Sequence, residues 1–433
     1  MRQLDALNYY TATRKYHLEF PRLGENIDAD VVVVGGGFSG INTSLELAEK
    51  GVTDIVVLEA RHLGYGGTGR NGGQVMAGIG HDLELVRKHV GEAGLETLFG
   101  VANLGAGIIR ERIEKYAIDA DFRSGYGYLA FNQRQRKTLE GWAAEFQRIA
   151  PEDHIELVTG SAVRDVVGSE AYCAAIKHMG GGHVHSLNLL LGEAKALVGL
   201  GGRIFENSPA VRVEYGPDHV VVHTHEGSVR ARKLLWACNG FLEGLEPDIW
   251  GKTINTYAFQ VATEPLPEEV ILQISPIRGA YSDIRPVIDY YRVTNENRLL
   301  FGAATDFVEY VPKDLFVWNR ARMLRIFPYL SDVKVDMAWG GPLCCSVNLF
   351  PQIGTLPQRP HVFYVQGYAG FGVTPSHIVC KVLAEGMSEG SARYDLMSSI
   401  PHASVVGKEA LRVPLLTAGK TWHQLSGFFA GRR

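Results

Sequence analysis

The residues best suited to chemistry form a glycine-rich turn near the start of the chain. Gly35, Gly37 and Gly40 fit the spacing GxGxxG, and Glu59 follows Gly40 by 19 residues. In this pattern the first glycine permits a tight turn, the second lets a pyrophosphate approach the backbone, and the third lets a helix pack closely on a strand. A carboxylate placed like Glu59 accepts hydrogen bonds from ribose hydroxyls. These residues predict a dinucleotide site, and FAD and NAD both fit it.

The flanking sequence supplies the elements that this turn needs. Residues 31–34 are four consecutive valines, which is typical of a strand buried on both faces. A helix is expected at 40–50 and a second buried strand at 54–58. Together they form one βαβ unit, whose helix N-terminus would offer free N–H groups to phosphates.

Two later glycine-rich segments favour a flavin over a nicotinamide. The loop at 66–74 can lay its backbone against a large flat ring, with Thr68 and Asn71 as short polar arms. The segment 366–375 follows a buried strand and opens a helix at Gly372. The positive end of that helix would stabilise the negative charge of a reduced flavin. A nicotinamide enzyme has no need of this second helix start.

Composition narrows the class of protein. The 433 residues are 46% apolar and 21% charged, with a formal charge of −4, which argues against a basic nucleic-acid surface. No signal peptide or membrane span is predicted, because the apolar stretch at 189–200 is interrupted by Glu193 and Lys195. The five cysteines lack metal-site or redox-pair spacing, so we expect reduced thiols in a cytoplasmic protein.

The order of elements predicts two interleaved domains of the α/β class. Helices are expected at 83–116, 133–149 and 375–385, and strands at 125–131, 211–222, 234–237, 255–263, 287–304 and 361–366. The dinucleotide-binding domain is predicted to comprise 28–82, 153–243 and 335–390. The substrate domain would then comprise 83–152 and 244–334, and residues 391–433 would form a C-terminal extension.

Five segments carry a resemblance to a known family: 31–40, 64–74, 181–189, 289–302 and 366–374. They are similar to the gamma-glutamylputrescine oxidoreductases, a bacterial polyamine-catabolic branch of the D-amino-acid-oxidase superfamily. The Gly-Arg-Asn-Gly-Gly-Gln loop at 69–74 and the His-x-His-x-x-Asn-Leu segment at 183–189 are fairly specific to this branch. The resemblance covers nearly the whole chain. It implies a Rossmann-type FAD-binding domain interleaved with an antiparallel-sheet α+β substrate domain.

The resemblance also implies a reaction, in which a C–N bond of a small amine is oxidised. A neutral amine would pass a hydride to flavin N5, the imine would hydrolyse to an aldehyde, and dioxygen or another acceptor would take the electrons. Amino-acid oxidases of the superfamily often bind the substrate carboxylate with an Arg shortly after a Trp-x-Gly segment. Here the segment 339–345 has no Arg, which favours a gamma-glutamylated amine. The alternatives are a secondary amino acid such as pipecolate, proline or sarcosine, a flavoprotein subunit active only with a partner, and a nicotinamide dehydrogenase.

Individual residues are assigned expected roles on this basis. Arg292 is the candidate for a remote substrate carboxylate, with Arg70 as second choice, although each could form a structural ion pair instead. Tyr290 and Tyr291 alternate on a strand, so only one can face the pocket, and Tyr291 is taken as the candidate. His81 is a candidate proton acceptor.

The remaining expectations concern cofactors. His183 and His185 are expected to make structural hydrogen bonds, and no metal site is predicted. Cys344 and Cys345 lie near where some relatives attach FAD, but buried inert thiols and non-covalent FAD are expected. The oligomeric state is left open. The expected FAD contacts are Gly35, Gly37, Phe38, Ser39, Gly40, Glu59, Ala60, Arg61, Gly67, Thr68, Arg70, Asn71, Gly72, Gly73, Gln74, Val211, Asn239, Gly240, Gly370, Gly372, Val373 and Thr374.

Overall fold

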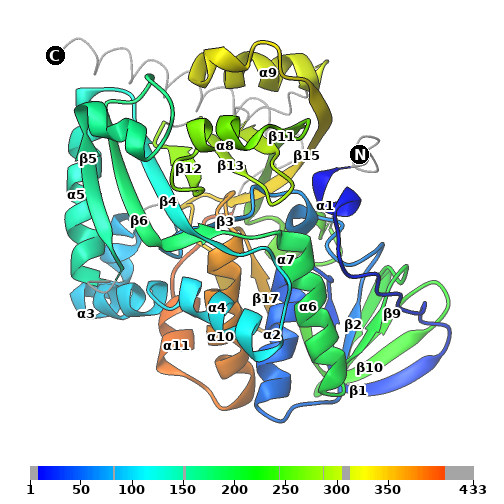
Figure 1. Cartoon of the computed structure of the whole chain (residues 1–433). Coiled ribbons are helices and arrows are strands. Elements are labelled where there is room, and N and C mark those ends of the chain that lie inside the picture. The colour runs from blue at the N-terminus through cyan, green and yellow to red at the C-terminus, as the bar shows by residue number, and fades with distance from the viewer. Residues whose placement is uncertain are drawn as a thin grey trace.

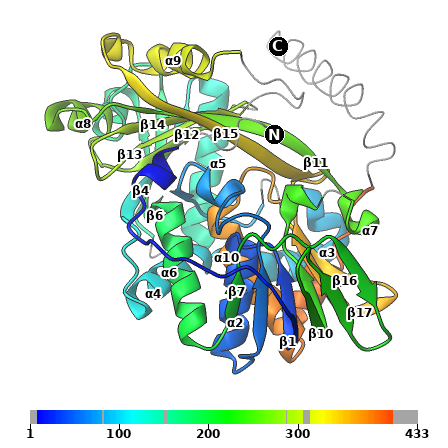
Figure 2. The same ribbon diagram turned by 90° about the vertical axis from the view of Figure 1, so that its right-hand side faces the viewer.

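Two mixed β-sheets, one above the other in Figure 1, organise the chain. The computed structural model describes residues 8–80, 83–149, 153–242, 244–285, 287–304 and 313–404. The carboxyl ends of the parallel strands in the first sheet point toward the second sheet (Figure 2). The α/β class that the sequence predicts is confirmed, and the two sheets are consistent with a Rossmann-type domain and a substrate domain.

The first sheet is built around the predicted buried strands. Its order is β16-β17-β10-β1-β2-β7, and β1 pairs in parallel with both β10 and β2. The four consecutive valines of β1 are all buried, as a strand covered on both faces requires. The antiparallel strands β8 and β9 extend β10. The bounds are β1 Asn26–Val34, β2 Ile55–Leu58, β7 Arg203–Phe205, β8 Arg212–Tyr215, β9 Val220–His223, β10 Ser228–Trp236, β16 Gln352–Leu356 and β17 Arg359–Gln366.

A group of helices packs beside the first sheet. Helix α2 contacts both α6 and α10, and α10 also contacts α4. The predicted helical region at 83–116 is confirmed as α3 and α4, which are separated at Asn103 and Leu104, and α3 is kinked at Gly91, whose φ of 66° is not helical. The bounds are α2 Phe38–Glu49, α3 Glu84–Ala102, α4 Gly105–Lys115, α6 Ser186–Gly199, α7 Pro247–Trp250, α10 Val373–Ser388 and α11 Ala392–Ser398.

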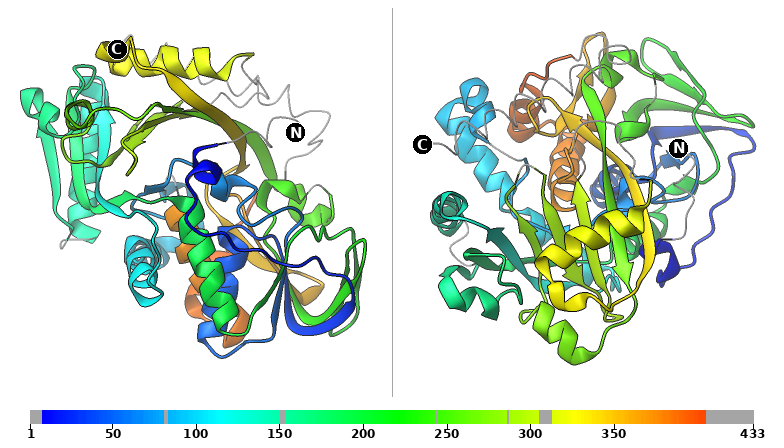
Figure 3. Two further views of the ribbon diagram at one scale, coloured as in Figure 1. Left: turned by 45° about the vertical axis from the view of Figure 1, so that its right-hand side comes forward. Right: turned by 90° about the horizontal axis from the view of Figure 1, so that it is seen from above.

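The second sheet has the order β15-β11-β14-β13-β12-β4-β6-β3, with β5 paired to β6. Helix α9 lies across the outer face of this sheet (Figure 3), and α5 packs against β4, β5 and β6. The bounds are β3 Gln74–Val75, β4 Arg123–Ala130, β5 Ile155–Thr159, β6 Ala174–His183, β11 Thr253–Thr263, β12 Ala280–Asp283, β13 Asp289–Val293, β14 Leu299–Ala304, β15 Val335–Ser346, α5 Gln133–Ile149, α8 Glu268–Ile274 and α9 Leu315–Ile326.

Three segments differ from what the sequence predicts. Strands β5 and β6, and strand β15, belong to the second sheet, whereas the sequence predicts 153–243 and 335–390 as parts of the dinucleotide-binding domain. Their residues alternate or mix polar and apolar types, which does not reveal which sheet a strand joins. The structure also contains a short helix that the sequence does not predict, α1 (Tyr9–Ala12), whose N-terminus Asn8 caps. The exact domain boundaries stay a prediction.

Candidate active site

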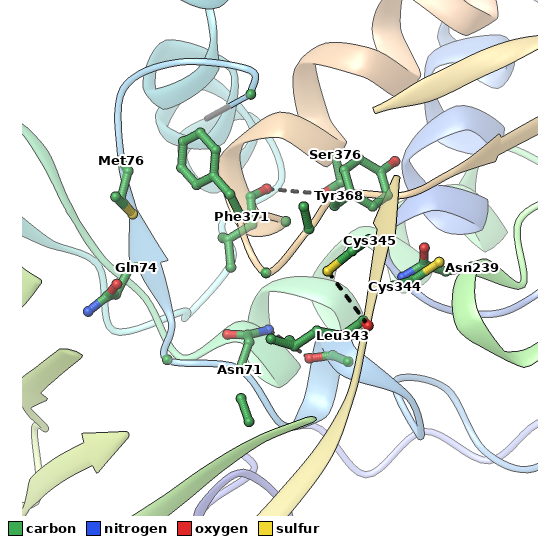
Figure 4. A pocket seen from close by; sticks show the side chains of 18 of the residues that line it. Asn71, Gln74, Met76, Asn239, Leu343, Cys344, Cys345, Tyr368, Phe371 and Ser376 are labelled. Atoms are coloured by element: carbon green, nitrogen blue, oxygen red, sulfur yellow. Dashed lines mark hydrogen bonds between the residues drawn. The ribbon is translucent and has the colours of Figure 1, made fainter. Parts of the chain in front are cut away.

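A cavity of about 2510 Å³ lies between the two sheets. Single-ligand pockets usually measure roughly 300–1,000 Å³, so this cavity has room for a dinucleotide and a substrate together. One wall comes from the carboxyl ends of β1 and β2, and the opposite wall from β11, β12 and β15. Figure 4 shows the inner part, with Gln74 and Met76 on one side and Cys344 and Cys345 on the other.

The predicted dinucleotide turn faces the cavity. Gly35 has φ +119°, and a Cβ on it would lie 2.5 Å from the carbonyl oxygen of Ala237, so only glycine fits this turn. Helix α2 starts directly after Gly37 and has no side-chain cap. The N–H of Phe38 donates to the Thr68 hydroxyl at 3.0 Å, and the N–H groups that follow it at the helix start suit a phosphate. Gly40 packs instead of lining the cavity, because a Cβ there would lie 1.9 Å from the oxygen of Gly35.

Glu59 is held in place to receive a ribose. Its Oε2 accepts a hydrogen bond from the backbone N–H of Gly36, and its Oε1 accepts one from the N–H of Arg61, both at 2.8 Å. Burial raises the pKa of the Glu59 carboxyl, and these two backbone bonds oppose the shift. Ala60 and Arg61 line the cavity beside it, as expected. These features fit the adenosine half of FAD.

The flavin loop, residues 66–74, is braced from within. The Asn71 side-chain amide donates to the carbonyl oxygens of Gly67 and Thr68, at 3.1 and 2.9 Å. Its Oδ1 accepts from the N–H of Gly73 and from the Ser186 hydroxyl, both at 2.7 Å. These hydrogen bonds hold the backbone of the loop in one conformation, which a binding site for a flat ring requires.

Gln74 connects the flavin loop to the second sheet. Its Nε2 donates to the carbonyl oxygen of Tyr281 at 2.9 Å, and its Oε1 accepts from the Tyr126 hydroxyl at 3.1 Å. Gln74 also begins β3, which pairs with β6. The ring site and the substrate sheet are therefore fixed relative to each other.

The second helix start also faces the cavity. Helix α10 follows Gly372 and has no side-chain cap, and Gly370, Gly372 and Val373 line the cavity as predicted. The Asn239 side chain accepts a hydrogen bond from the Gly367 N–H at 3.0 Å and lines the cavity beside Gly240. The free N–H groups of α10 would face negative charge on a reduced flavin. The residues present therefore fit FAD at both of its halves.

Besides Gly40, three predicted contacts lie outside the cavity lining. Val211 is exposed and donates its N–H to the carbonyl of His223, and its neighbours Pro209 and Ala210 line the cavity instead. Gly73 supports the loop from behind, since a Cβ there would lie 2.3 Å from the oxygen of Val184. The Thr374 hydroxyl accepts a hydrogen bond from the Met76 N–H at 3.0 Å.

The two neighbouring tyrosines of strand β13 face the opposite way from what we predict from the sequence. Tyr290, not Tyr291, lines the cavity, and Tyr291 points into the core beneath the sheet, where its hydroxyl lies 3.2 Å from that of Tyr172. Alternation along the strand explains the difference, because the sequence leaves open which of the two neighbours faces inward. Tyr290 packs on the flavin loop, since a Cβ on Gly72 would lie 3.0 Å from its ring.

Arg292 is buried behind the flavin loop and does not line the cavity, so its candidate role in binding a remote carboxylate is corrected. Its Nε donates to the carbonyl oxygen of Gly72 at 2.8 Å, and its Nη2 lies 3.3 Å from the Tyr10 hydroxyl. The flavin loop on one side and the N-terminal segment on the other therefore enclose this side chain. Arg292 positions the loop from behind.

The other candidate residues have mixed outcomes. Arg70 lines the cavity, and its Nε donates to the Tyr65 carbonyl at 2.8 Å. His81 lies outside the described residues. Burial and the nearby Arg292 charge lower the pKa of His185 to about 3 and hold that of His183 well below its ordinary value.

Both histidines make hydrogen bonds within the protein. The His185 Nδ1 accepts from the N–H of Asn188 at 3.1 Å, which caps α6, and the His183 Nε2 lies 3.1 Å from the Arg278 carbonyl. Across the described ranges, no group of three His, Cys, Asp or Glu side chains could hold a metal ion.

The strand β15 supplies the inner wall. Cys344 and Cys345 both line the cavity and point to opposite sides of the strand (Figure 4). Burial raises the pKa of the Cys345 thiol to about 12, so it is neutral near pH 7. The indole of Trp339 donates to the Arg70 carbonyl at 3.1 Å and joins this wall to the flavin loop.

Comparison with known proteins identifies the family. The family model "DAO: FAD dependent oxidoreductase" matches residues 30–386. The chain belongs to the DAO family. Gamma-glutamylputrescine oxidoreductase of Escherichia coli is 35% identical over 96% of this chain and 97% of its own length.

Solved structures show the DAO fold. Glycine oxidase from Bacillus cereus superposes with a TM-score of 0.68 at 19% identity, over 87% of this chain and 99% of that one. L-proline dehydrogenase from P. horikoshii gives 0.70 at 18% identity, over 86% and 95%. The chain is an FAD-dependent oxidoreductase of a family that acts on amines and amino acids.

Among the described helices, none is long and apolar enough to span a membrane.

Several cavity residues of this DAO-family chain were missed at the sequence level. Met76, Leu343 and Phe371 line the inner part, and Arg134 and Arg285 line a more distant part. Met76 and Phe371 lie beside or within the predicted glycine-rich segments, and Leu343 lies four residues after Trp339. Their positions could have identified them as cavity residues. The two arginines carry no local pattern. Arg134 lies on α5, which follows β4, and Arg285 follows β12, so the pairing of β12 with β4 brings their segments to one edge of the sheet.

Proposed function

We propose that this chain oxidises the terminal amine carbon of a gamma-glutamylated amine, such as gamma-glutamylputrescine, to an aldehyde by way of an imine. The observation that carries the proposal is the uncharged wall that β15 presents to the cavity from Gly341 to Cys345. A carboxylate placed beside this wall would be desolvated without a charged partner on the strand. A substrate with its amine here and its carboxylate far away avoids that cost. The 35% identical relative of that name supports the same substrate.

The residues have distinct parts in this reaction. FAD, when bound, would accept the hydride that leaves the amine-bearing carbon as its C–N single bond becomes a C=N bond. Met76, Leu343 and Phe371 line the space beside the flavin loop with apolar side chains, which excludes water from the reacting carbon. Burial raises the pKa of the Tyr290 hydroxyl, so this group stays protonated and is available as a hydrogen-bond donor. It would orient the substrate rather than accept its proton.

Further properties belong to the same proposal. FAD is held without a covalent bond, since the Cys345 thiol is protonated and a thiolate is the reactive form. Dioxygen or another acceptor takes the electrons from the reduced cofactor. The protein works in the cytoplasm, in keeping with five cysteines that are all free thiols.

A secondary amino acid is the second candidate substrate, and one observation favours it. A Cβ on Gly341 would lie 3.1 Å from Cδ of Arg70, so this side chain runs along the inner wall. Its guanidinium could meet a substrate carboxylate in place of the missing Arg on β15.

Product analysis separates the two classes of substrate. The purified protein is incubated with gamma-glutamylputrescine, pipecolate and sarcosine in parallel, and the products are identified by mass spectrometry. We expect an aldehyde from gamma-glutamylputrescine. Turnover of pipecolate or sarcosine alone would replace the proposal with the second candidate. Turnover that requires an added protein fraction would indicate a subunit that works only with a partner.

A further inference from the structure

The cavity continues past the flavin loop to a group of charged side chains at one edge of the second sheet. Strand β12 runs parallel to β4, with Asp283 opposite Leu129, so both strands end at this edge. The side chains Arg134, Asp283, Arg285 and Arg322 line the cavity there, and we call them the distal site. We propose that the distal site binds the α-carboxylate of the gamma-glutamyl group. This inference rests on the proposed function and names what holds the far end of its substrate.

Two buried carboxylates hold the arginines of the distal site. Nη2 of Arg285 lies 2.6 Å from Oδ2 of Asp283 and also bonds to Asp289. Nε of Arg322 lies 2.7 Å from Oδ1 of Asp289. The Arg285 guanidinium is stacked over the Phe131 ring, 4.4 Å from its centroid. These contacts fix its direction, as a site that recognises a carboxylate requires.

A further positive charge makes the distal site attractive to an anion. Arg285 and Arg322 are balanced by the two carboxylates, whereas the exposed side chain of Arg134 makes no hydrogen bond or ion pair within the described residues. Nη1 of Arg285 likewise makes no hydrogen bond to any described residue. Guanidinium groups with unused N–H donors bind carboxylates in a planar, directional geometry. A substrate carboxylate would accept hydrogen bonds from the unused donors of Arg134 and Arg285.

The spacing suits a gamma-glutamyl amine. Strand β12 begins beside the flavin loop, where Tyr281 accepts the hydrogen bond of Gln74 at 2.9 Å. Arg285 lies four residues further on, which is at most roughly 13 Å at strand rise. In gamma-glutamylputrescine, eight bonds separate the amine-bearing carbon from the α-carbon, roughly 10 Å when extended. A hydrogen bond of about 2.9 Å to a guanidinium covers the remainder.

The residues between the two ends keep the path open. Ser282 and Tyr290 line the cavity between the flavin loop and the distal site. If the ion pairs of Arg285 and Arg322 served only to stabilise the fold, they would not need Arg134 beside them at the cavity surface. Placing the carboxylate here leaves the uncharged wall of β15 for the reacting carbon, so the two observations support one binding mode.

The test uses the flavin-loaded protein and two substrates. Flavin bleaching under anaerobic conditions is followed against the concentration of gamma-glutamylputrescine and of N-acetylputrescine, which has the same amine end but no amino-acid head. The variants are Arg134→Met and Arg285→Lys. The control is Arg136→Met, since Arg136 lies on the same helix, pairs with Glu140 at 2.9 Å and does not line the cavity.

We expect the wild type to prefer gamma-glutamylputrescine by at least tenfold in half-saturating concentration. Arg134→Met should reduce this preference at least tenfold with little change in the limiting bleaching rate for gamma-glutamylputrescine, because the contact is far from the reacting carbon. Arg285→Lys should reduce it as well, since an ammonium lacks the planar fork. Arg136→Met should keep it.

Four results would overturn the inference. An undiminished preference in both variants would exclude the distal site, and so would an equal loss in Arg136→Met. A wild type that bleaches equally well with both amines would exclude it while leaving the amine chemistry intact. A wild type that no gamma-glutamyl amine bleaches would overturn the proposed function together with the distal site, so the two failures are distinguishable.

Discussion

Glu59 offers a direct test of how the cavity holds FAD. Glu59→Gln keeps the shape of the side chain but removes its charge, and only one of its two polar atoms can still accept a hydrogen bond. A ribose hydroxyl then meets a neutral acceptor, which costs about 1 kcal/mol relative to a charged one. The N–H of Gly36 or Arg61 loses its acceptor in the free and in the FAD-bound protein alike, so this loss cancels in the binding free energy. The remaining cost of about 1 kcal/mol corresponds to about fivefold in Kd.

The assay titrates the apoprotein with FAD and follows the quenching of flavin fluorescence. Glu206→Gln is the matched control, because Glu206 accepts a backbone hydrogen bond from Leu63 at 2.6 Å but does not line the cavity. We expect its Kd to change by less than about threefold. If Glu59→Gln bound FAD as tightly as the wild type, or if both variants weakened equally, the reasoning about the ribose site would be refuted.

The pH dependence of FAD binding tests the same carboxylate. Burial raises the pKa of Glu59 above its ordinary value, so it takes up a proton at a higher pH than an exposed Glu. The charged form is the better acceptor for ribose, and FAD affinity should therefore fall as the pH is lowered through this raised pKa. Glu59→Gln has no such group and should show a flatter profile. Parallel profiles for the two proteins would contradict the assignment.

The remaining predictions concern stability, orientation and attachment. Arg112→Met removes the guanidinium that lies 2.7 and 3.0 Å from the buried carboxylates of Glu46 and Glu193. Lys381 still pairs with Glu46 and His377 still contacts Glu193, so the free energy of unfolding from denaturant titration should fall by about 3 kcal/mol, against at most about 1 kcal/mol for the exposed Lys115→Met. Gly302→Ala puts a Cβ 2.3 Å from the Tyr290 ring, and we expect a roughly tenfold slower anaerobic bleaching with FAD still bound; an unchanged rate would remove Tyr290 from the site. Acid precipitation should release all flavin into the supernatant, whereas flavin that stays with the protein in the wild type but not in Cys345→Ser would show a covalent bond at that thiol.

Local patterns in the sequence were sufficient for the cofactor half of the site. Gly35, Gly37 and Glu59 have roles set by the turn, the helix start and the strand end, all within about thirty residues of chain. The helix start at Gly372 is of the same local kind. Each of these residues lines the cavity, because the geometry that they need is encoded next to them.

The substrate half depends on how distant strands pair, and local patterns do not contain that information. Alternation predicted that only one of Tyr290 and Tyr291 faces inward, but the choice is made by packing on the flavin loop and on Tyr172. Arg292 shares a strand face with Tyr290, yet the loop separates it from the cavity. Arg285 reaches the cavity through the pairing of β12 with β4.

The most direct test of the central claim is the visible spectrum of the purified protein before and after anaerobic addition of gamma-glutamylputrescine. The account predicts the bands of an oxidised flavin, at about 370 and 450 nm, and their bleaching by this amine. A flavin spectrum that the gamma-glutamyl amine leaves unchanged, while pipecolate or sarcosine bleaches it, would contradict the proposed substrate. A colourless protein that also fails to bind added FAD would contradict the whole account.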